Sequence, residues 1–155
     1  MSARARTPAG SALTELVLDL FRLTGRMLVA GDQLVGDLGL TSARWQVLGA
    51  IVEAARPQPV AWLARDLGTA RQNVQRIVHD LANEGLVAFA ANPHHRRAHL
   101  VVLTDQGKQA FDAAMQRQAP WINRLAEGLP VADIETTRRI VSTLRQKLES
   151  EQEPP

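Results

Sequence analysis

The apolar positions in the first part of the chain recur with the spacing of an α-helix. Between Ser11 and Gly36 most of them share one stripe or lie beside it, and two fall on the opposite side. A helix that is apolar around so much of its circumference must be covered on more than one face, which a chain of 155 residues could hardly do alone. We therefore expect a second copy of the chain to cover it. The stripe is Leu16, Leu20, Leu23, Met27 and Leu34, flanked by Val17, Phe21 and Leu28, with Leu18 and Val29 opposite.

Shorter helical patterns follow this long one. Thr41 or Ser42 can cap a helix that ends at the proline-rich break 56–59, and another helix covers residues 60–67.

A tight turn then leads into a fourth helix. Gly68 favours the turn, Thr69 is suited to cap the helix that follows, and that helix runs to about Glu84, where Gly85 closes it. Two helices joined by a short glycine turn form a helix-turn-helix arrangement.

The hydrophobic period changes after the fourth helix. Residues 86–91 and 98–103 are strand-length apolar runs, separated by the polar segment 92–97. They predict a β-hairpin with a basic tip. Helical patterns return near residue 105, where Pro120 should kink or interrupt the helix, and again from about Val131.

Composition narrows the class of protein. The chain has 18 Lys and Arg against 16 Asp and Glu, a net charge of +2, so its pI of about 9.9 overstates how basic it is. The absence of cysteine excludes disulfides, thiolate nucleophiles and cysteine-ligated zinc. No apolar run approaches the ~20 residues of a membrane span, and we expect a cytoplasmic protein that does not act at a membrane.

The fourth helix has two distinct faces. Its inner stripe recurs at helical spacing through Val74, Ile77, Val78 and Leu81. Arginine fits the two acceptors of guanine and side-chain amides fit adenine, so the opposite face suits the DNA major groove. The alternative is a face that only keeps the helix soluble, and the adjoining turn and basic hairpin weigh against it. The outer face is Gln72, Arg76, His79 and Asn83, flanked by Asn73 and Gln75.

The hairpin tip supplies a second basic element. Arg96 and Arg97 lie where a two-stranded wing would approach DNA, and guanidinium groups bind phosphates or enter a narrow minor groove. Charged tips also protect edge strands, which is the alternative explanation. Together with Arg71 and Arg76 they concentrate positive charge on one predicted region, which favours nucleic acid more than the net charge does.

These segments resemble a known family. LARDLG (63–68), TARQNVQR (69–76) and LANEGLV (81–87) resemble the helix-turn-helix of the multiple antibiotic resistance regulator (MarR) family. NPHHRRA (92–98) and VLTDQG (102–107) resemble that family's wing and the start of its next helix. The resemblance is specific from about residue 40 to 110. Many members have an aspartate where this chain has Asn92 and another where it has His95, and one of these is thought to orient a wing arginine.

The resemblance implies a homodimeric winged-helix transcription factor. Its fold class would be mainly α with a small β-hairpin, with a winged helix-turn-helix DNA-binding domain at 40–104. The helical dimerisation region would be 11–36 and 105–150, and flexible tails would cover 1–10 and 151–155. The dimer would bind a pseudo-palindromic double-stranded DNA operator, as a repressor that a small aromatic or phenolic ligand releases.

Residue-level expectations follow from these patterns and the resemblance together. A ligand pocket is expected where large side chains meet at helix junctions, at Met27, Arg44, Trp45 and Trp62, although such residues also build cores. No metal or cofactor is expected. The predicted DNA-contacting residues are Thr69, Arg71, Gln72, Asn73, Gln75, Arg76, His79, His95, Arg96 and Arg97.

Three alternatives stay open. The histidines His79, His94, His95 and His99 could form a metal-sensing site. A winged helix could also serve as a protein-interaction module without DNA. An enzyme is the weakest alternative, because no nucleophile elbow, catalytic triad or metal-binding helix spacing is present in the sequence.

Overall fold

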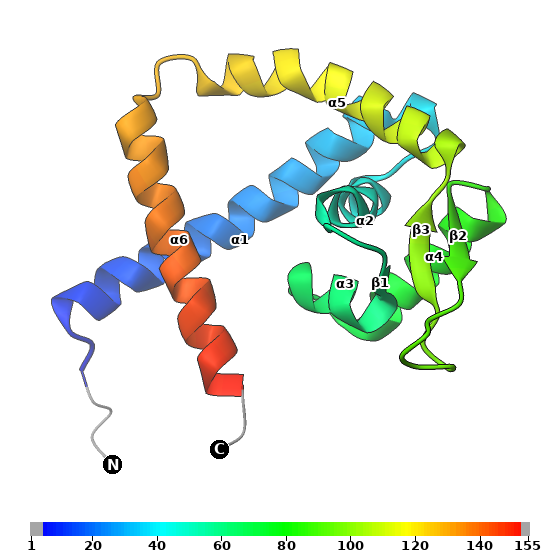
Figure 1. The fold of residues 1–155 in the computed structure, drawn as a ribbon. Helices are drawn as coiled ribbons and strands as arrows, with labels where there is room; N and C mark the ends of the chain where they lie inside the picture. Colours follow the sequence, from blue (N-terminus) through cyan, green and yellow to red (C-terminus); the bar gives the residue numbers. More distant parts are fainter. Residues whose placement is uncertain (1–4, 153–155) are drawn as a thin grey trace. The chain divides into compact units, whose positions relative to one another are not determined.

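The computed structural model describes residues 5–152, and its elements confirm a mainly helical fold with a small antiparallel sheet (Figure 1). Within these residues no helix is both long and apolar enough to cross a membrane. The elements in chain order are α1 (Pro8–Val35), the 3₁₀ helix η1 (Gly36–Leu38), α2 (Ser42–Glu53), β1 (Gln58–Pro59), α3 (Val60–Asp66), α4 (Arg71–Asn83), β2 (Val87–Ala90), β3 (Leu100–Leu103), α5 (Asp105–Ala126) and α6 (Val131–Gln152).

The sheet has three strands in the order β1-β3-β2, one more than the predicted hairpin. In the hairpin Val87 pairs with Leu103 and Ala90 with Leu100, so both strands are shorter than predicted and the loop between them is longer. The additional strand, β1, lies in the predicted break and pairs with the other side of β3. Proline favours extended backbone and is tolerated on an edge strand, which explains why a break in the sequence pattern became a strand.

One hydrophobic core holds α2, α3, α4 and the sheet together. Its members come from the end of α1, from each of these helices, from two strands and from α5, so the helix-turn-helix and the hairpin share a single interior. A shared interior fixes the angle between the two. The buried apolar residues are Val35, Leu40, Val47, Leu48, Val60, Leu63, Ala64, Val74, Val78, Leu81, Leu86, Val87, Val101 and Ala114.

The turn between α3 and α4 forms at the predicted glycine. Gly68 has φ +63°, a backbone conformation that favours glycine. The prediction that Thr69 caps α4 was wrong: the N-cap is Ala70, which makes no side-chain cap hydrogen bond. The reason is that the turn is one residue longer than expected, since the Thr69 N–H donates to the Ala64 carbonyl at 3.0 Å and so belongs to the turn.

A small-residue joint connects α1 to α2. The Ser42 hydroxyl donates to the Leu28 carbonyl at 2.7 Å, and the Ser42 N–H donates to the Asp32 carboxylate at 2.7 Å. A Cβ at Gly31 would lie 2.3 Å from that hydroxyl oxygen, so the two helices approach too closely for a larger residue. Thr41 is the N-cap of α2, one of the two residues predicted.

Most of α1 lies outside the core, as its sequence pattern predicted. Only Gly31 and Val35 of this helix are buried, whereas Phe21 is 73% exposed. The helix also begins earlier than predicted, at Pro8, because the Thr7 hydroxyl accepts the Gly10 N–H at 3.0 Å. The predicted N-terminal tail is therefore helical from residue 8, and its first four residues lie outside the described part of the chain.

Pro120 was expected either to kink or to interrupt the helix that begins near residue 105. The second outcome was wrong, because α5 is continuous. Pro120 lies inside a continuous helical segment. It is exposed, as is Gln116, so water can hydrogen-bond the carbonyl that proline leaves unpaired. The chain nevertheless divides into two compact units between Gln118 and Ala119, directly before this proline.

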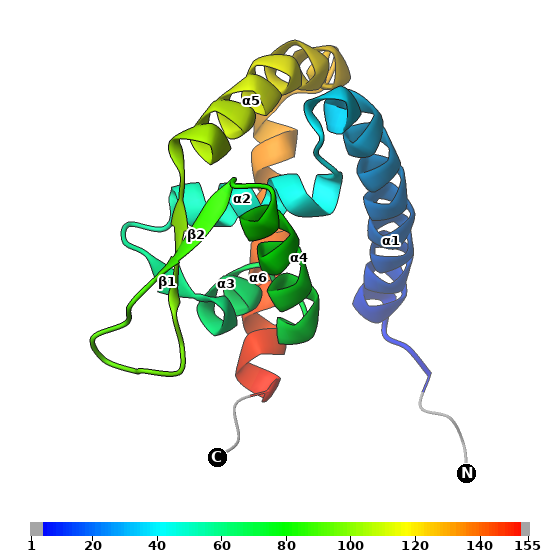
Figure 2. The ribbon, with the colours of Figure 1, turned by 90° about the vertical axis from the view of Figure 1, so that its right-hand side faces the viewer.

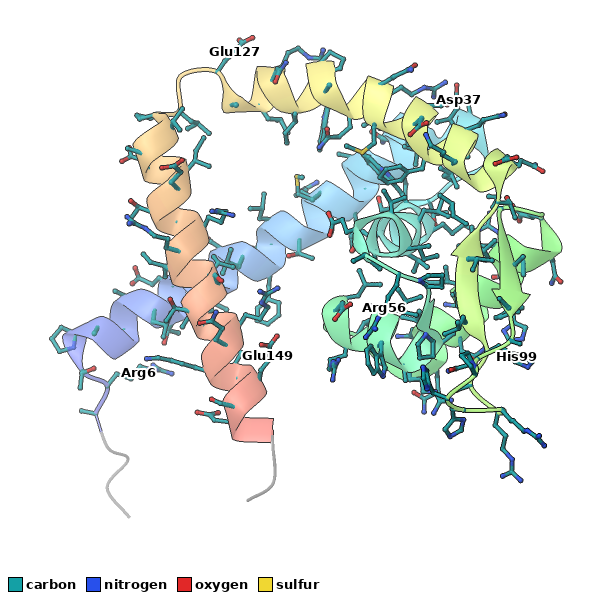
Figure 3. The ribbon with its side chains drawn as sticks, viewed as in Figure 1. Arg6, Asp37, Arg56, His99, Glu127 and Glu149 are labelled. Atoms are coloured by element: carbon teal, nitrogen blue, oxygen red, sulfur yellow. The ribbon has the colours of Figure 1, made fainter. Side chains whose placement is uncertain are left out.

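The part of α5 that belongs to the first unit, residues 105–118, is bound to the end of α1. The Arg117 guanidinium donates to the Leu34 carbonyl at 3.2 Å and pairs with the Asp37 carboxylate, which Figure 3 labels. The hydrogen bond from Arg117 lowers the pKa of Asp37 below its ordinary value. Arg117 thus links α5 to the end of α1 and to η1.

The second unit contains the end of α5 and all of α6. No residue of α6 between 131 and 151 is buried, and Val131 is 70% exposed. The helix continues through Gln152, so the first two residues of the predicted C-terminal tail are helical, and residues 153–155 lie outside the described part. Other exposed apolar residues of this unit are Leu125, Leu129, Ile134, Ile140, Val141 and Leu148.

We predict that Gly107→Ala destabilises the fold by about 3 kcal/mol, because the added methyl group meets fixed backbone. A Cβ at Gly107 would lie 1.9 Å from the Leu86 carbonyl oxygen. Thermal unfolding measures the change. Gly36→Ala is the matched control, since Gly36 has helical dihedrals and no atom within 4 Å of an added Cβ. Equal melting temperatures for the two variants would contradict this packing.

Candidate nucleic-acid interface

The outer face of α4 carries the predicted base-contacting residues. Val74, Val78 and Leu81 are fully buried at 0% exposure, which fixes the rotation of the helix about its own axis. As a result the opposite side chains point to solvent. The exposed members of the predicted set on this helix are Arg71, Gln72, Asn73, Arg76 and His79, and Thr69 is exposed in the turn before it.

One edge of α4 is occupied by contacts to the sheet. The His79 ring lies 5.4 Å from the Phe89 ring, centroid to centroid, and the Phe89 ring lies 6.3 Å from that of His99. His79 Nδ1 also lies 3.0 Å from the Gln75 amide nitrogen and 2.9 Å from the Gln75 carbonyl oxygen. His79 thus contacts the hairpin through Phe89, and Gln75 is bonded to His79 within α4, whereas Arg76 is exposed to solvent.

The loop 91–99 between β2 and β3 forms the wing, and it extends beyond the ends of the strands (Figure 2). Asn92 closes it: its side-chain amide donates to the Ala98 carbonyl at 2.8 Å, and its side-chain oxygen accepts the His94 N–H at 3.0 Å. An aspartate could make only the second bond. The wing side chains His95, Arg96 and Arg97 are exposed, and Figure 3 labels His99 where the loop returns to β3.

A cleft of about 190 Å³ lies where α4, the wing and the start of α3 meet. Its walls include Arg71, Gln75 and His79 from α4 and Arg97 from the wing, so it joins both groups of predicted DNA-contacting residues. This concentrates cationic side chains on one side of the winged domain. The remaining lining residues are Pro59, Val60, Ala61, Phe89, Ala98 and His99.

The four residues suggested for a ligand pocket do not line this cleft. Met27 is 37% exposed and Trp62 is 44% exposed, so neither belongs to the core, and Trp62 instead lies under the Arg65 guanidinium at 5.4 Å. Trp45 packs against the core from α2. Arg44 forms an ion pair with Glu84. Ligand binding at these four positions stays a prediction.

The histidines do not gather into a metal site. Within residues 5–152, no group of three or more histidine, cysteine or acidic side chains is placed to hold a metal ion. His79 and His99 flank Phe89, whereas His94 and His95 are exposed in the wing loop. This arrangement gives no support to the metal-sensing alternative.

A model of the MarR family matches residues 38–98, from the end of η1 to the second-last residue of the wing. The uncharacterized protein Rv2011c of Mycobacterium tuberculosis is 38% identical over 126 residues, which cover 81% of this chain and 87% of that protein. The chain belongs to the MarR family of winged-helix regulators.

Two further relatives have described functions. The transcriptional activatory protein BadR of Rhodopseudomonas palustris is 30% identical over 65% of this chain and 59% of its own length. The transcriptional repressor CouR, solved with a 23-mer DNA duplex, is 25% identical, with a TM-score of 0.74 over 91% of this chain and 99% of that chain. CouR from Rhodococcus jostii RHA1 was also solved with p-coumaroyl-CoA, at 25% identity and a TM-score of 0.74 over 83% and 90% of the two chains. Both relatives are named as transcriptional regulators.

The sequence prediction for this MarR-family chain missed the aromatic contact between helix and hairpin. Phe89 was assigned only to a strand, and His99 was considered only as a metal ligand. The available signal was the alternation of the strand: Val87 is buried, which places Phe89 on the same face, toward α4. Single residues of a short strand give too weak a pattern for that inference without the register.

We predict that Asn92→Asp loosens the wing of this MarR-family protein, because the variant loses the donor to the Ala98 carbonyl. Amide exchange of His95 and Ala98, whose N–H groups bond within the loop, should become about tenfold faster if the hydrogen bond contributes ~1.4 kcal/mol. Hydrogen exchange followed by NMR measures this. Asn92→Ala, which removes both bonds, should be at least as fast, and unchanged rates in both variants would refute the role of Asn92.

Proposed function

We propose that this MarR-family protein is a homodimeric, sequence-specific regulator that binds a pseudo-palindromic double-stranded DNA operator. The observation that carries the proposal is the orientation of α4, whose buried stripe holds Arg71, Gln72 and Arg76 outward beside the cationic wing. An arginine can bond both acceptors of a guanine, and a glutamine or asparagine can do the same for adenine. Thr69, Asn73, Gln75, His79 and His95 would complete the contact surface.

The wing would supply affinity rather than sequence choice. Arg96 and Arg97 lie in an exposed loop without a paired carboxylate among the described ion pairs, and so they are available to phosphates. The CouR structure with a DNA duplex supports a DNA-binding function for a chain of this fold.

Dimerisation is supported by the apolar surface of α1. Leu18, Phe21, Leu23 and Val29 are each exposed by about half or more in the single chain. An apolar surface of this kind on a soluble domain marks an interface. A two-fold dimer would place two copies of α4 about one DNA turn apart, ~34 Å, in successive major grooves.

We further propose that the protein represses its target and is released by a small phenolic or aromatic ligand. The support is CouR, named as a repressor and solved with the phenolic thioester p-coumaroyl-CoA. BadR, by contrast, is named an activatory protein, so a reporter assay with and without a phenolic acyl thioester must determine the direction of control.

The function is tested by selecting bound duplexes from a random library and then measuring variants on the selected operator. We expect Arg76→Ala to cost about 1–3 kcal/mol on the operator and to relax preference at one base pair in each half-site. An equal loss on operator and random DNA would contradict a base-reading role. If no sequence is enriched at low salt, the protein-interaction alternative is favoured.

We expect Arg96→Ala to behave differently from Arg76→Ala. Loss of a phosphate contact should weaken binding to operator and random duplexes alike, and should reduce the slope of log affinity against log salt by about 1. Titrations at several salt concentrations measure the slope. A slope equal to that of the unchanged protein would mean that Arg96 does not contact phosphate.

We predict that Phe21→Glu dissociates the dimer, since a charge would be buried where an exposed ring is proposed to pack against the partner. The loss should be about 2–4 kcal/mol of dimerisation free energy. Sedimentation equilibrium gives the dissociation constant. Asp19→Ala, at an exposed ion pair of the same helix, is the control and should remain a dimer. A dimeric Phe21→Glu variant would place the interface elsewhere.

A further inference from the structure

The C-terminal end of α4 carries an unusual charge. Glu84 is the C-cap residue of this helix, and Gly85 follows it with φ +76°. The carbonyl groups at a helix C-terminus carry partial negative charge, so a carboxylate is disfavoured there and a cation is favoured. The Glu84 carboxylate is therefore favourable at this position only when a cationic side chain lies beside it.

Arg44 of α2 is that partner. Its guanidinium donates from Nη1 to one Glu84 carboxylate oxygen at 3.1 Å and from Nη2 to the other. This two-bond pairing fixes direction as well as distance, since both groups are planar. The Arg44 side chain is only 18% exposed, against 49% for Glu84, so the pair is better shielded from water than the exposed ion pairs on the helices.

The same guanidinium also contacts the segment that connects η1 to α2. Arg44 Nη1 donates to the Gly39 carbonyl at 2.9 Å, and the Arg44 backbone N–H donates to the Thr41 hydroxyl at 3.2 Å. Ser42, which follows Thr41 in the sequence, is hydrogen-bonded to Leu28 and Asp32 of α1. A continuous set of short polar contacts thus runs from α1, through the start of α2, to the end of α4, and all of it lies in one compact unit.

We propose that Arg44 is a positioning residue for DNA recognition, which holds the C-terminal end of α4 in a fixed direction relative to α1 through Glu84. The inference rests on the proposed function, in which α1 carries the dimer interface and α4 reads the operator. A dimer must present its two copies of α4 at one spacing and angle relative to α1. The Thr104 hydroxyl donates to the Gly85 and Leu86 carbonyls at 2.6 and 3.0 Å and so ties the C-terminal end of α4 to the end of β3, but fixing this end relative to α1 needs a further contact. The Arg44–Glu84 pair restrains that end.

The test compares operator and random duplexes of equal length, at one salt concentration, on the full-length dimer. We expect Arg44→Ala to weaken operator binding by about tenfold while random-duplex binding changes by less than about twofold, because the phosphate-contacting arginines are untouched. A purely structural role would lower the melting temperature without changing the ratio of the two affinities. Equal losses on both duplexes, or no loss on either, would overturn the proposal.

A second substitution separates positioning from simple loss of an arginine. Adding Glu84→Gln to Arg44→Ala removes the unpaired carboxylate from the helix end, and we expect it to recover about threefold of the operator affinity. No recovery would overturn the pairing argument. If Arg44→Ala does not fold, Glu84→Ala alone decides: an operator-specific loss of about threefold supports the proposal, and an unchanged affinity ratio overturns it.

The matched control is Lys108→Ala, which removes an exposed ion pair within α5, Lys108 to Asp112 at 2.5 Å, and should leave the affinity ratio unchanged. The two proposals can fail separately. Unchanged protein that does not prefer any sequence would refute the proposed function itself. A clear preference that is lost in Arg76→Ala but kept in Arg44→Ala would refute only the positioning role of Arg44.

Discussion

The burial of one side of α4 is the constraint on which the rest of the structure depends. Val74, Val78 and Leu81 enter a core that α2, α3 and the sheet complete, and the cost of exposing three such side chains, ~1.5–3 kcal/mol each, fixes the rotation of the helix. The outward direction of Arg76 is therefore a consequence of packing. Because β2 and β3 enter the same core, the wing is oriented by the same burial that orients the helix.

Rotation about its axis is only part of what fixes the placement of α4. Apolar packing restrains rotation well, yet it restrains tilt less, because an apolar contact has no preferred direction. Directional contacts lie where tilt would occur: the His79 ring packs at a tilt of 50° against the Phe89 ring along one edge, and Glu84 pairs with Arg44 at the C-terminal end. Apolar residues thus hold α4 in the core, and polar and aromatic contacts fix the direction of its axis.

Sequence reasoning succeeded where a pattern repeats and failed where one contact decides. The helices, the glycine turn and the two faces of α4 follow from spacing that recurs over several residues, and the over-apolar α1 was recognised for the same reason. Thr69 was mistaken for a cap because a threonine after a glycine fits equally a turn or a cap. The strand at Gln58 and the engagement of Arg44 with Glu84, 40 residues away, depend on tertiary neighbours that no local pattern encodes.

The two ends of α1 differ in how they are packed. Its last two turns are held to α2 by the close approach of Gly31 and Ser42 and to α5 by the hydrogen bond from Arg117 to the Leu34 carbonyl, whereas its earlier apolar residues are exposed in the single chain. A helix that is rigidly joined at one end and apolar along its length is suited to carry the geometry of an interface into the domain it joins. Any change that shifts α1 in a dimer must act on α2 at Ser42, two residues before the arginine that holds the end of α4. In the proposed dimer, a ligand that moved this joint would change the direction of α4.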